Sequence, residues 1–157
     1  MAEGAVARTI RILMVEDSAL DAELITAQLL RAGVSFTTER TWSDEGMREA
    51  LQQRSFDVIL ADHVLPGFDG DTALTLACEL APLTPFIFVS GTLTEELAVQ
   101  ALKRGARDYV VKSRLQRLPD AVVRAIAESE ERQKLVQAEE RLKLITDSLP
   151  ALISHLD

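Results

Sequence analysis

Short apolar runs alternate with helix-like patterns along most of this chain, and this alternation limits the folds that it can adopt. Runs typical of strands occupy residues 10–15, 34–39, 57–61, 85–89 and 108–111. Patterns typical of helices occupy residues 21–32, 43–53, 70–80 and 92–104, and a last one begins near Pro119. Five repeats of strand and helix predict a doubly wound α/β fold, with a parallel sheet between two layers of helices.

Chemically active side chains stand directly after four of the predicted strands. Glu16 and Asp17 follow the first strand, Asp62 the third, Ser90 the fourth and Lys112 the fifth. The carboxyl ends of parallel strands lie along one edge of a sheet, and ligands bind at that edge. We therefore expect three carboxylates, a hydroxyl and an ammonium group to converge there.

A set of this composition can hold a cation and take part in phosphoryl transfer. Neighbouring carboxylates repel one another unless a cation or a shared proton neutralises them, and hard oxygen ligands suit Mg²⁺. A carboxylate beside Mg²⁺ can attack a phosphoryl group and form an acyl phosphate. Lys112 would then offset charge on the transferred oxygens, and Ser90 would donate a hydrogen bond to one of them.

Each of these residues alone has an ordinary structural explanation. An Asp at a strand end can form a turn, and Glu16 and Asp17 can belong to the cap of the next helix together with Ser18. Lys112 alone can be a solvated surface residue. The joint placement after strands one, three, four and five favours the functional interpretation.

The charge distribution argues against nucleic acid as a partner. The formal net charge is -8, and up to Ser113 the chain has 17 acidic and 10 basic side chains, whereas domains that bind nucleic acid carry basic patches. No apolar run is long enough to span a membrane, and the N-terminus does not resemble a signal peptide. We expect a cytoplasmic protein that binds no membrane. Cys78 lies in a helical pattern and is expected to be a buried thiol.

The last helical pattern continues further than a compact domain needs. Residues 121–149 contain neither Gly nor Pro, and Pro150 is expected to end the helix. Apolar residues with heptad spacing are Leu135, Ala138, Leu142, Ile145 and Leu149. Such spacing is typical of a coiled coil. It predicts either a homodimer formed through residues 120–149 or a solitary exposed helix.

The segments that carry these residues resemble the receiver domains of bacterial response regulators. The matching segments are residues 12–18, 57–67, 89–91 and 108–112. The resemblance covers residues 9–128 and implies a flavodoxin-like sheet with the strand order 2-1-3-4-5. It also implies a signalling switch rather than an enzyme, which receives its phosphoryl group from a histidine kinase or a phosphotransfer protein.

The resemblance assigns a role to each site residue. Asp62 resembles the phosphoacceptor, assisted by Lys112 and Ser90, and Ser90 forms a switch pair with Tyr109. In the family, the hydroxyl of this pair moves toward the phosphoryl group and the aromatic ring turns inward. The Mg²⁺ ligands that it implies are Asp17, Asp62, the backbone carbonyl of Val64 and, through water, Glu16.

The chain departs from the family pattern near the site. Receiver domains commonly have a proline after the lysine, often with a cis bond, but Ser113 stands here. Val64 and Thr92 occupy positions that tune the loss of the phosphoryl group, and neither offers a carboxylate or an amide to orient water. We therefore expect slow autodephosphorylation.

The end of the chain suggests a further module. Residues 145–153 resemble the first residues of a PAS sensory domain, so the long helix is expected to pass the state of the receiver to a PAS or output module in the same protein. The predicted division is a disordered extension (1–8), the receiver domain (9–128), a linker helix (129–148) and the start of a PAS domain (149–157).

Three other functions fit a parallel α/β sheet. A Mg²⁺-dependent aspartyl phosphatase would place a second acid two residues after Asp62, but Val64 stands there. A flavodoxin-like cofactor binder would need a phosphate-binding loop in place of Glu16 and Asp17. A dimerisation module that works without phosphorylation keeps the same fold, although the intact acidic site argues against it.

Overall fold

The sheet of this protein has five parallel strands. The computed structural model describes residues 8–92 and 94–156, with side chains described as far as residue 145. Within these residues the strand order is β2-β1-β3-β4-β5, which confirms the predicted flavodoxin-like topology. The strands are β1 (Ile10–Val15), β2 (Phe36–Thr41), β3 (Val58–Ala61), β4 (Phe86–Ser90) and β5 (Asp108–Val111).

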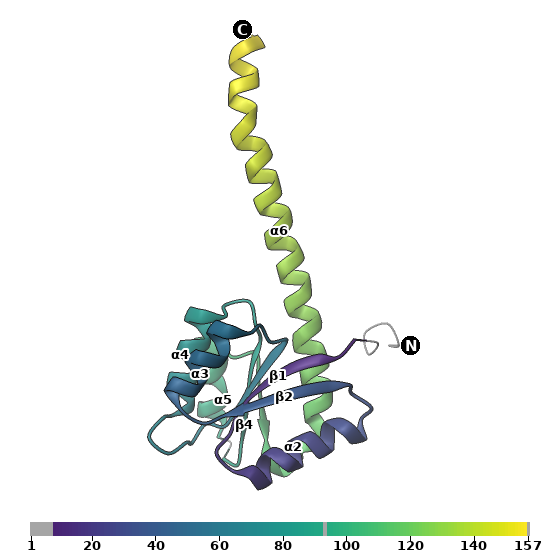
Figure 1. Cartoon of the computed structure of the whole chain (residues 1–157), viewed down its shortest axis with the longest axis vertical. Coiled ribbons are helices and arrows are strands. Elements are labelled where there is room, and N and C mark those ends of the chain that lie inside the picture. Colours follow the sequence, from purple (N-terminus) through teal and green to yellow (C-terminus); the bar gives the residue numbers. More distant parts are fainter. Residues whose placement is uncertain (1–7, 93, 157) are drawn as a thin grey trace.

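Helices cover both faces of the sheet (Figure 1). One layer contains α2 (Ala19–Arg31) and α6 (Leu118–Leu156), and the other contains α3 (Asp44–Gln53), α4 (Gly70–Leu80) and α5 (Glu95–Arg104). Successive side chains of a strand point to opposite faces. Accordingly, Ile12 and Met14 of β1 pack in the core beneath the first layer, while Leu13 and Val15 pack beneath the second.

The second strand begins two residues later than the sequence pattern predicts. Gly33, at φ +81°, ends α2, and its N–H donates to the carbonyl of Leu30. The N–H of Val34 donates to the carbonyl of Leu29. This pair of hydrogen bonds is the Schellman arrangement that closes a helix. Because Val34 completes the helix end, the strand starts only at Phe36.

The start of α5 also differs from the prediction. The capping-box pattern at Thr92 and Glu95 predicts a helix that opens at Thr92, but the capping residue is Thr94, whose hydroxyl accepts from the N–H of Leu97. The carbonyl of Thr92 instead accepts a hydrogen bond from Tyr109. Thr92 therefore belongs to the loop at the carboxyl edge of the sheet.

Two further expectations are wrong. Cys78, expected to be buried, is exposed on α4, because the buried stripe of this helix runs through Ala73, Leu74, Leu76 and Ala77. Helix α6 does not end at Pro150 but continues to Leu156. A proline inside a helix removes one N–H donor and crowds the carbonyl four residues earlier, yet the helical backbone continues through Pro150. The predicted N-terminal extension, apart from Arg8, lies outside the described residues.

Helix α6 begins near the carboxyl edge of the sheet and leaves the domain at the opposite edge. Its last described buried side chain is Ser129, which donates to the carbonyl of Leu83 just before β4. Glu130 pairs with Arg8, which precedes β1, at 3.0 Å. Beyond this point the helix projects from the domain (Figure 1). Among the described residues, no helix is both long and apolar enough to cross a membrane.

Candidate functional site

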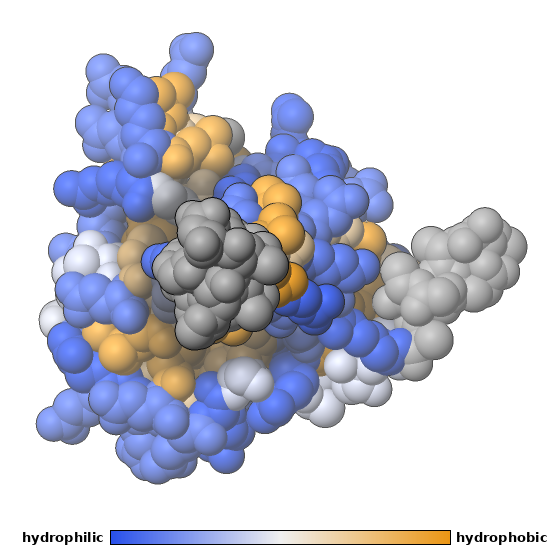
Figure 2. Space-filling view, turned by 90° about the horizontal axis from the view of Figure 1, so that it is seen from above, coloured by the Kyte–Doolittle hydropathy of each residue, from blue (hydrophilic) through white to orange (hydrophobic). Residues whose placement is uncertain are grey.

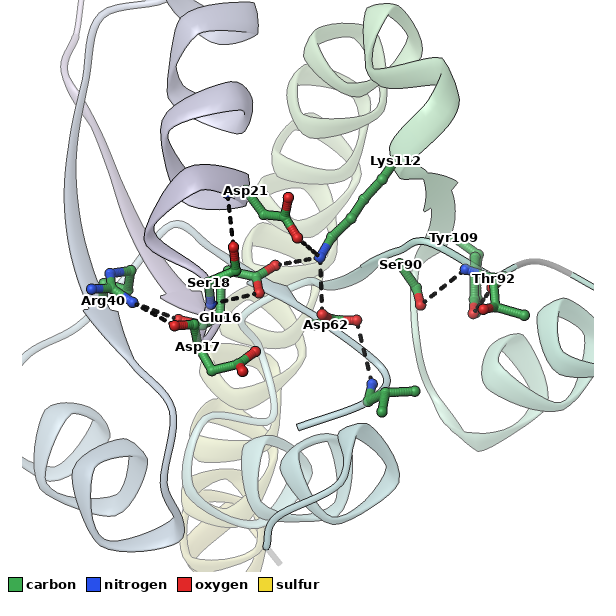
Figure 3. A network of polar contacts seen from close by, with 11 residues as sticks. Glu16, Asp17, Ser18, Asp21, Arg40, Asp62, Ser90, Thr92, Tyr109 and Lys112 are labelled. Atoms are coloured by element: carbon green, nitrogen blue, oxygen red, sulfur yellow. Dashed lines mark hydrogen bonds and ion pairs between the residues drawn. The ribbon is translucent and has the colours of Figure 1, made fainter. Parts of the chain in front are cut away.

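The carboxyl ends of the strands bring the predicted site residues together (Figure 3). Glu16 and Asp17 follow β1, Asp62 follows β3, Ser90 ends β4 and Lys112 follows β5. Lys112 opens a short 3-10 helix, η1 (Lys112–Arg117), which leads directly into α6. Peptide bonds of the described residues are trans, and this includes the bond between Lys112 and Ser113.

Lys112 lies among three carboxylates. Its Nζ atom is 2.8 Å from Glu16 Oε1, 2.7 Å from Asp21 Oδ2 and 2.9 Å from Asp62 Oδ2. Burial acts to lower the pKa of Lys112, but the contacts with Asp21, Glu16 and Asp62 outweigh it and raise the pKa above its ordinary value. The ammonium group therefore stays charged and is shared between the acidic side chains.

Glu16, Asp17 and Asp62 form a candidate cation site. One carboxylate oxygen of each residue lies within 4.8 Å of the others. Burial raises the pKa of Glu16, opposed by the contact with Lys112 and by the Ser18 N–H, which donates to Glu16 Oε2 at 3.1 Å. Glu16 Oε1 is buried and accepts no hydrogen bond of good geometry, although it touches the ammonium of Lys112.

This arrangement fits a hard divalent cation. Three carboxylates that approach one another need positive charge to offset their repulsion, and Mg²⁺ accepts oxygen ligands of this kind while it retains several waters. The Asp17 side chain is exposed, whereas Asp62 and Glu16 are buried. The donor set thus opens toward solvent on one side, as a cation that keeps part of its water requires.

Arg40 on β2 fixes the backbone of Glu16 and Asp17, which form the acidic loop after β1. Its Nη1 donates to the carbonyl of Glu16 at 2.9 Å and to that of Asp17 at 3.4 Å. The guanidinium carbon lies 4.6 Å from the centre of the Trp42 ring, within the range of a cation–π contact. These contacts orient the two acidic residues without occupying their carboxylates.

The loop after Asp62 packs closely against the start of α4. The backbone N–H of Val64 donates to Asp62 Oδ1 at 3.3 Å, and the Gly70 N–H donates to the carbonyl of His63 at 2.9 Å. A Cβ at Gly70 would lie 2.7 Å from His63 Cα and 2.8 Å from the carbonyl oxygen of Asp62. Only glycine permits this approach, so α4 helps to hold the segment that carries Asp62.

Ser90 and Tyr109 lie next to each other, on the side of Asp62 that faces away from Glu16 and Asp17 (Figure 3). The Tyr109 ring is buried, and its hydroxyl donates to the carbonyl of Thr92 at 2.8 Å and lies 3.4 Å from His63 Nδ1. Burial raises the pKa of Tyr109, and a hydrogen bond with Ser90 opposes this. Ser90 is buried, and its Oγ accepts a long hydrogen bond from the N–H of Thr92. Both members of the predicted pair therefore contact the same loop.

Sequence reasoning did not identify Asp21 and Arg40. Asp21 lies in the first turn of α2 and contacts Lys112, which is 91 residues away. A signal for Asp21 was present, because the first turn of a helix that follows the acidic loop faces the carboxyl edge of the sheet. Arg40 gave no such signal, since β2 carries none of the predicted site residues.

Comparison with known proteins agrees with this fold. The family described as response regulator receiver domain matches residues 12–123. The chain therefore belongs to the receiver domains of two-component response regulators, and a phosphoacceptor role is consistent with this membership.

Individual relatives support the same assignment. A protein-glutamate methylesterase/protein-glutamine glutaminase of Archaeoglobus fulgidus is 40% identical over 105 residues, which are 65% of this chain and 29% of that protein. A receiver domain protein from Clostridium thermocellum is 28% identical with a TM-score of 0.65, covering 81% of this chain and 98% of that one. The chain thus spans less than a third of the length of its first curated relative, and the methylesterase activity is that protein's own.

A third match concerns the cation. The receiver domain of a sensor histidine kinase from Pseudomonas aeruginosa, with a magnesium ion coordinated in its active site cleft, has a TM-score of 0.61. The match covers 76% of this chain and 99% of that one, at 24% identity. At this identity the likeness is one of fold.

Proposed function

We propose that this chain is a phosphoacceptor switch in which Asp62 receives a phosphoryl group from a histidine kinase or a phosphotransfer protein. One observation carries the proposal. Asp62 is buried at the end of β3, its Oδ2 lies 2.9 Å from Lys112 Nζ, and two more carboxylates lie within 4.8 Å. A lone surface aspartate would have neither the lysine nor the acidic neighbours.

The proposed reaction forms one bond and breaks one. A carboxylate oxygen of Asp62 attacks the phosphorus of the donor, and the bond from phosphorus to the donor atom breaks, with its electron pair leaving on the donor. Lys112 offsets the negative charge of the transferred oxygens. The proposed Mg²⁺ ligands are Asp17, Asp62, the Val64 carbonyl and, through water, Glu16. When bound, Mg²⁺ would neutralise charge on the phosphoryl oxygens.

The proposed response runs through Ser90, Tyr109 and η1. Ser90 would turn from the Thr92 N–H toward the phosphoryl oxygens, and Tyr109 would follow the loop whose carbonyl it binds. Lys112 is the first residue of η1, so a shift of its backbone reaches α6 within six residues. We propose that α6 passes this change to a PAS or output module beyond residue 148.

Intact mass spectrometry tests the proposal. The chain is incubated with acetyl phosphate, with Mg²⁺ and with a chelator in its place. We expect a gain of one phosphoryl group that depends on the metal. If the mass is unchanged and Mg²⁺ does not shift the amide NMR signals of the chain, the alternative applies. The chain is then a dimerisation module that works without phosphorylation.

The phosphoryl group is expected to leave Asp62 slowly. The Val64 side chain, 72% exposed, lies beside the site but offers no carboxylate or amide to orient a water molecule. We predict a half-life of minutes or longer, measured by intact mass after removal of the donor. Val64→Asn should shorten it by roughly tenfold or more, whereas Val99→Asn, on the exposed side of α5, should leave it unchanged. A half-life of seconds for the unaltered chain contradicts this expectation.

We also propose that α6 pairs with a second copy of the chain. Leu135 and Leu142 are 61% and 62% exposed, and Ile145 is 51% exposed. These three side chains form an apolar stripe on α6, and Figure 2, which views the molecule from above, shows apolar patches on a surface that is otherwise mostly hydrophilic. Lys134 and Glu139 flank this stripe, and in a parallel pair Lys134 of one copy lies opposite Glu139 of the other. The charge pattern therefore favours a parallel dimer.

A charge exchange tests the pairing. Lys134→Glu places like charges opposite each other in both flanks, so the dimer should dissociate at a roughly tenfold higher concentration. The double variant Lys134→Glu with Glu139→Lys should restore the affinity. Analytical ultracentrifugation measures each dissociation constant, with Leu142→Asp as a monomeric reference. If the unaltered chain sediments like Leu142→Asp, α6 is a solitary helix.

A further inference from the structure

Asp21 makes the shortest of the three carboxylate contacts to Lys112, at 2.7 Å. It stands in the first turn of α2, where its backbone N–H donates to the side chain of the capping residue Ser18 at 3.1 Å. The positive end of a helix macrodipole favours a negative charge in this turn. The side chain is 33% exposed, so Asp21 forms the solvent side of the lysine's environment.

The other two partners of Lys112 can bind either the ammonium group or a cation. Glu16 and Asp62 belong to the cluster that can hold a cation, whereas Asp21 does not. An ammonium group has three N–H donors and no acceptor. If Glu16 and Asp62 turned to a cation before a phosphoryl group is present, a partly buried Lys112 without Asp21 would lose every carboxylate partner that it has, at a large cost.

We infer that Asp21 is a positioning residue, which holds Lys112 at the rim of the site so that Glu16 and Asp62 can bind a divalent cation. The inference rests on the proposed function. Without the charge of Asp21, Lys112 competes more strongly for the oxygens of Glu16 and Asp62. The site also loses one negative charge, and both effects weaken the binding of the cation.

The test compares three variants in a titration with Mg²⁺ alone. Binding is monitored through the amide NMR shifts of the acidic loop. Asp21→Asn keeps the shape of the side chain but removes its charge, and should raise the dissociation constant for Mg²⁺ by roughly tenfold. Asp21→Glu restores the charge and should recover most of the affinity. Asp44→Asn is the matched control, because Asp44 lies in the first turn of α3 and pairs with Arg48.

A second readout separates positioning from a structural role. The free energy of unfolding in urea should fall by similar amounts in Asp21→Asn and Asp44→Asn, since each loses a helix-end charge. Only Asp21→Asn should lose Mg²⁺ affinity. Equal Mg²⁺ affinities in these two variants overturn the inference, even if both bind more weakly than the unaltered chain. If the unaltered chain binds no Mg²⁺, the proposed function fails, and the inference falls with it.

Discussion

Asp62→Asn is expected to abolish the metal-dependent uptake of a phosphoryl group from acetyl phosphate. An ionised carboxylate oxygen can form an acyl phosphate, but the neutral amide of asparagine is a far poorer nucleophile. Asparagine keeps the size of the side chain, and its oxygen can still accept from Lys112 Nζ, which lies 2.9 Å from Asp62 Oδ2. Intact mass before and after incubation measures the loss directly.

The matched control for this variant is Asp57→Asn. Asp57 stands just before β3, at the opposite end of the strand from Asp62, where its Oδ2 accepts the backbone N–H of Arg11. This change removes the same charge and should leave phosphoryl uptake intact. An adduct that persists in Asp62→Asn would move the acceptor to another carboxylate, and peptide mapping would then identify it.

Phe88→Ala is expected to lower the free energy of unfolding by about 3–5 kcal/mol. Phe88 on β4 is fully buried, with its ring centre 5.0 Å from that of Phe86, 4.9 Å from His63 and 5.5 Å from Tyr109. Its removal leaves a cavity next to His63, which follows Asp62, and next to Tyr109. A loss of this size is a large share of the roughly 5–15 kcal/mol that stabilises a domain, and urea unfolding followed by circular dichroism measures it.

Phe36→Ala provides the comparison for this loss. Phe36 lies on the edge strand β2 and is only partly buried, so its removal should cost about 1–2 kcal/mol. A Phe88→Ala variant as stable as Phe36→Ala would contradict the packing described for β4. The near-ultraviolet circular dichroism of Tyr109 adds a specific check, because this ring should lose its fixed environment only when Phe88 is removed.

The sequence predicted much of the site because its residues follow from local patterns and one topological rule. Apolar runs placed the strands, and the carboxyl ends of parallel strands share one edge, so Glu16, Asp62 and Lys112 had to meet. Asp21 and Arg40 were missed for a different reason. Asp21 could have been placed at the carboxyl edge by its position in the first turn of α2, but its contact with Lys112, 91 residues away, depends on side-chain reach. Arg40 reaches Glu16 across 24 residues from a strand without site residues, and no local pattern contains that contact.

The sequence by itself determined the order of the strands and helices, the edge at which the acidic and basic groups gather, and the heptad spacing of the last helix. The order of elements along the chain and the heptad spacing depend on hydrophobic period, which is a local property, and the shared edge follows from the topological rule for parallel strands. Only the tertiary structure decided that Lys112 is shared among three carboxylates, that Tyr109 binds the Thr92 carbonyl and that Gly70 must lack a side chain. Those features arise where separate elements pack together, because close packing fixes which side chains touch.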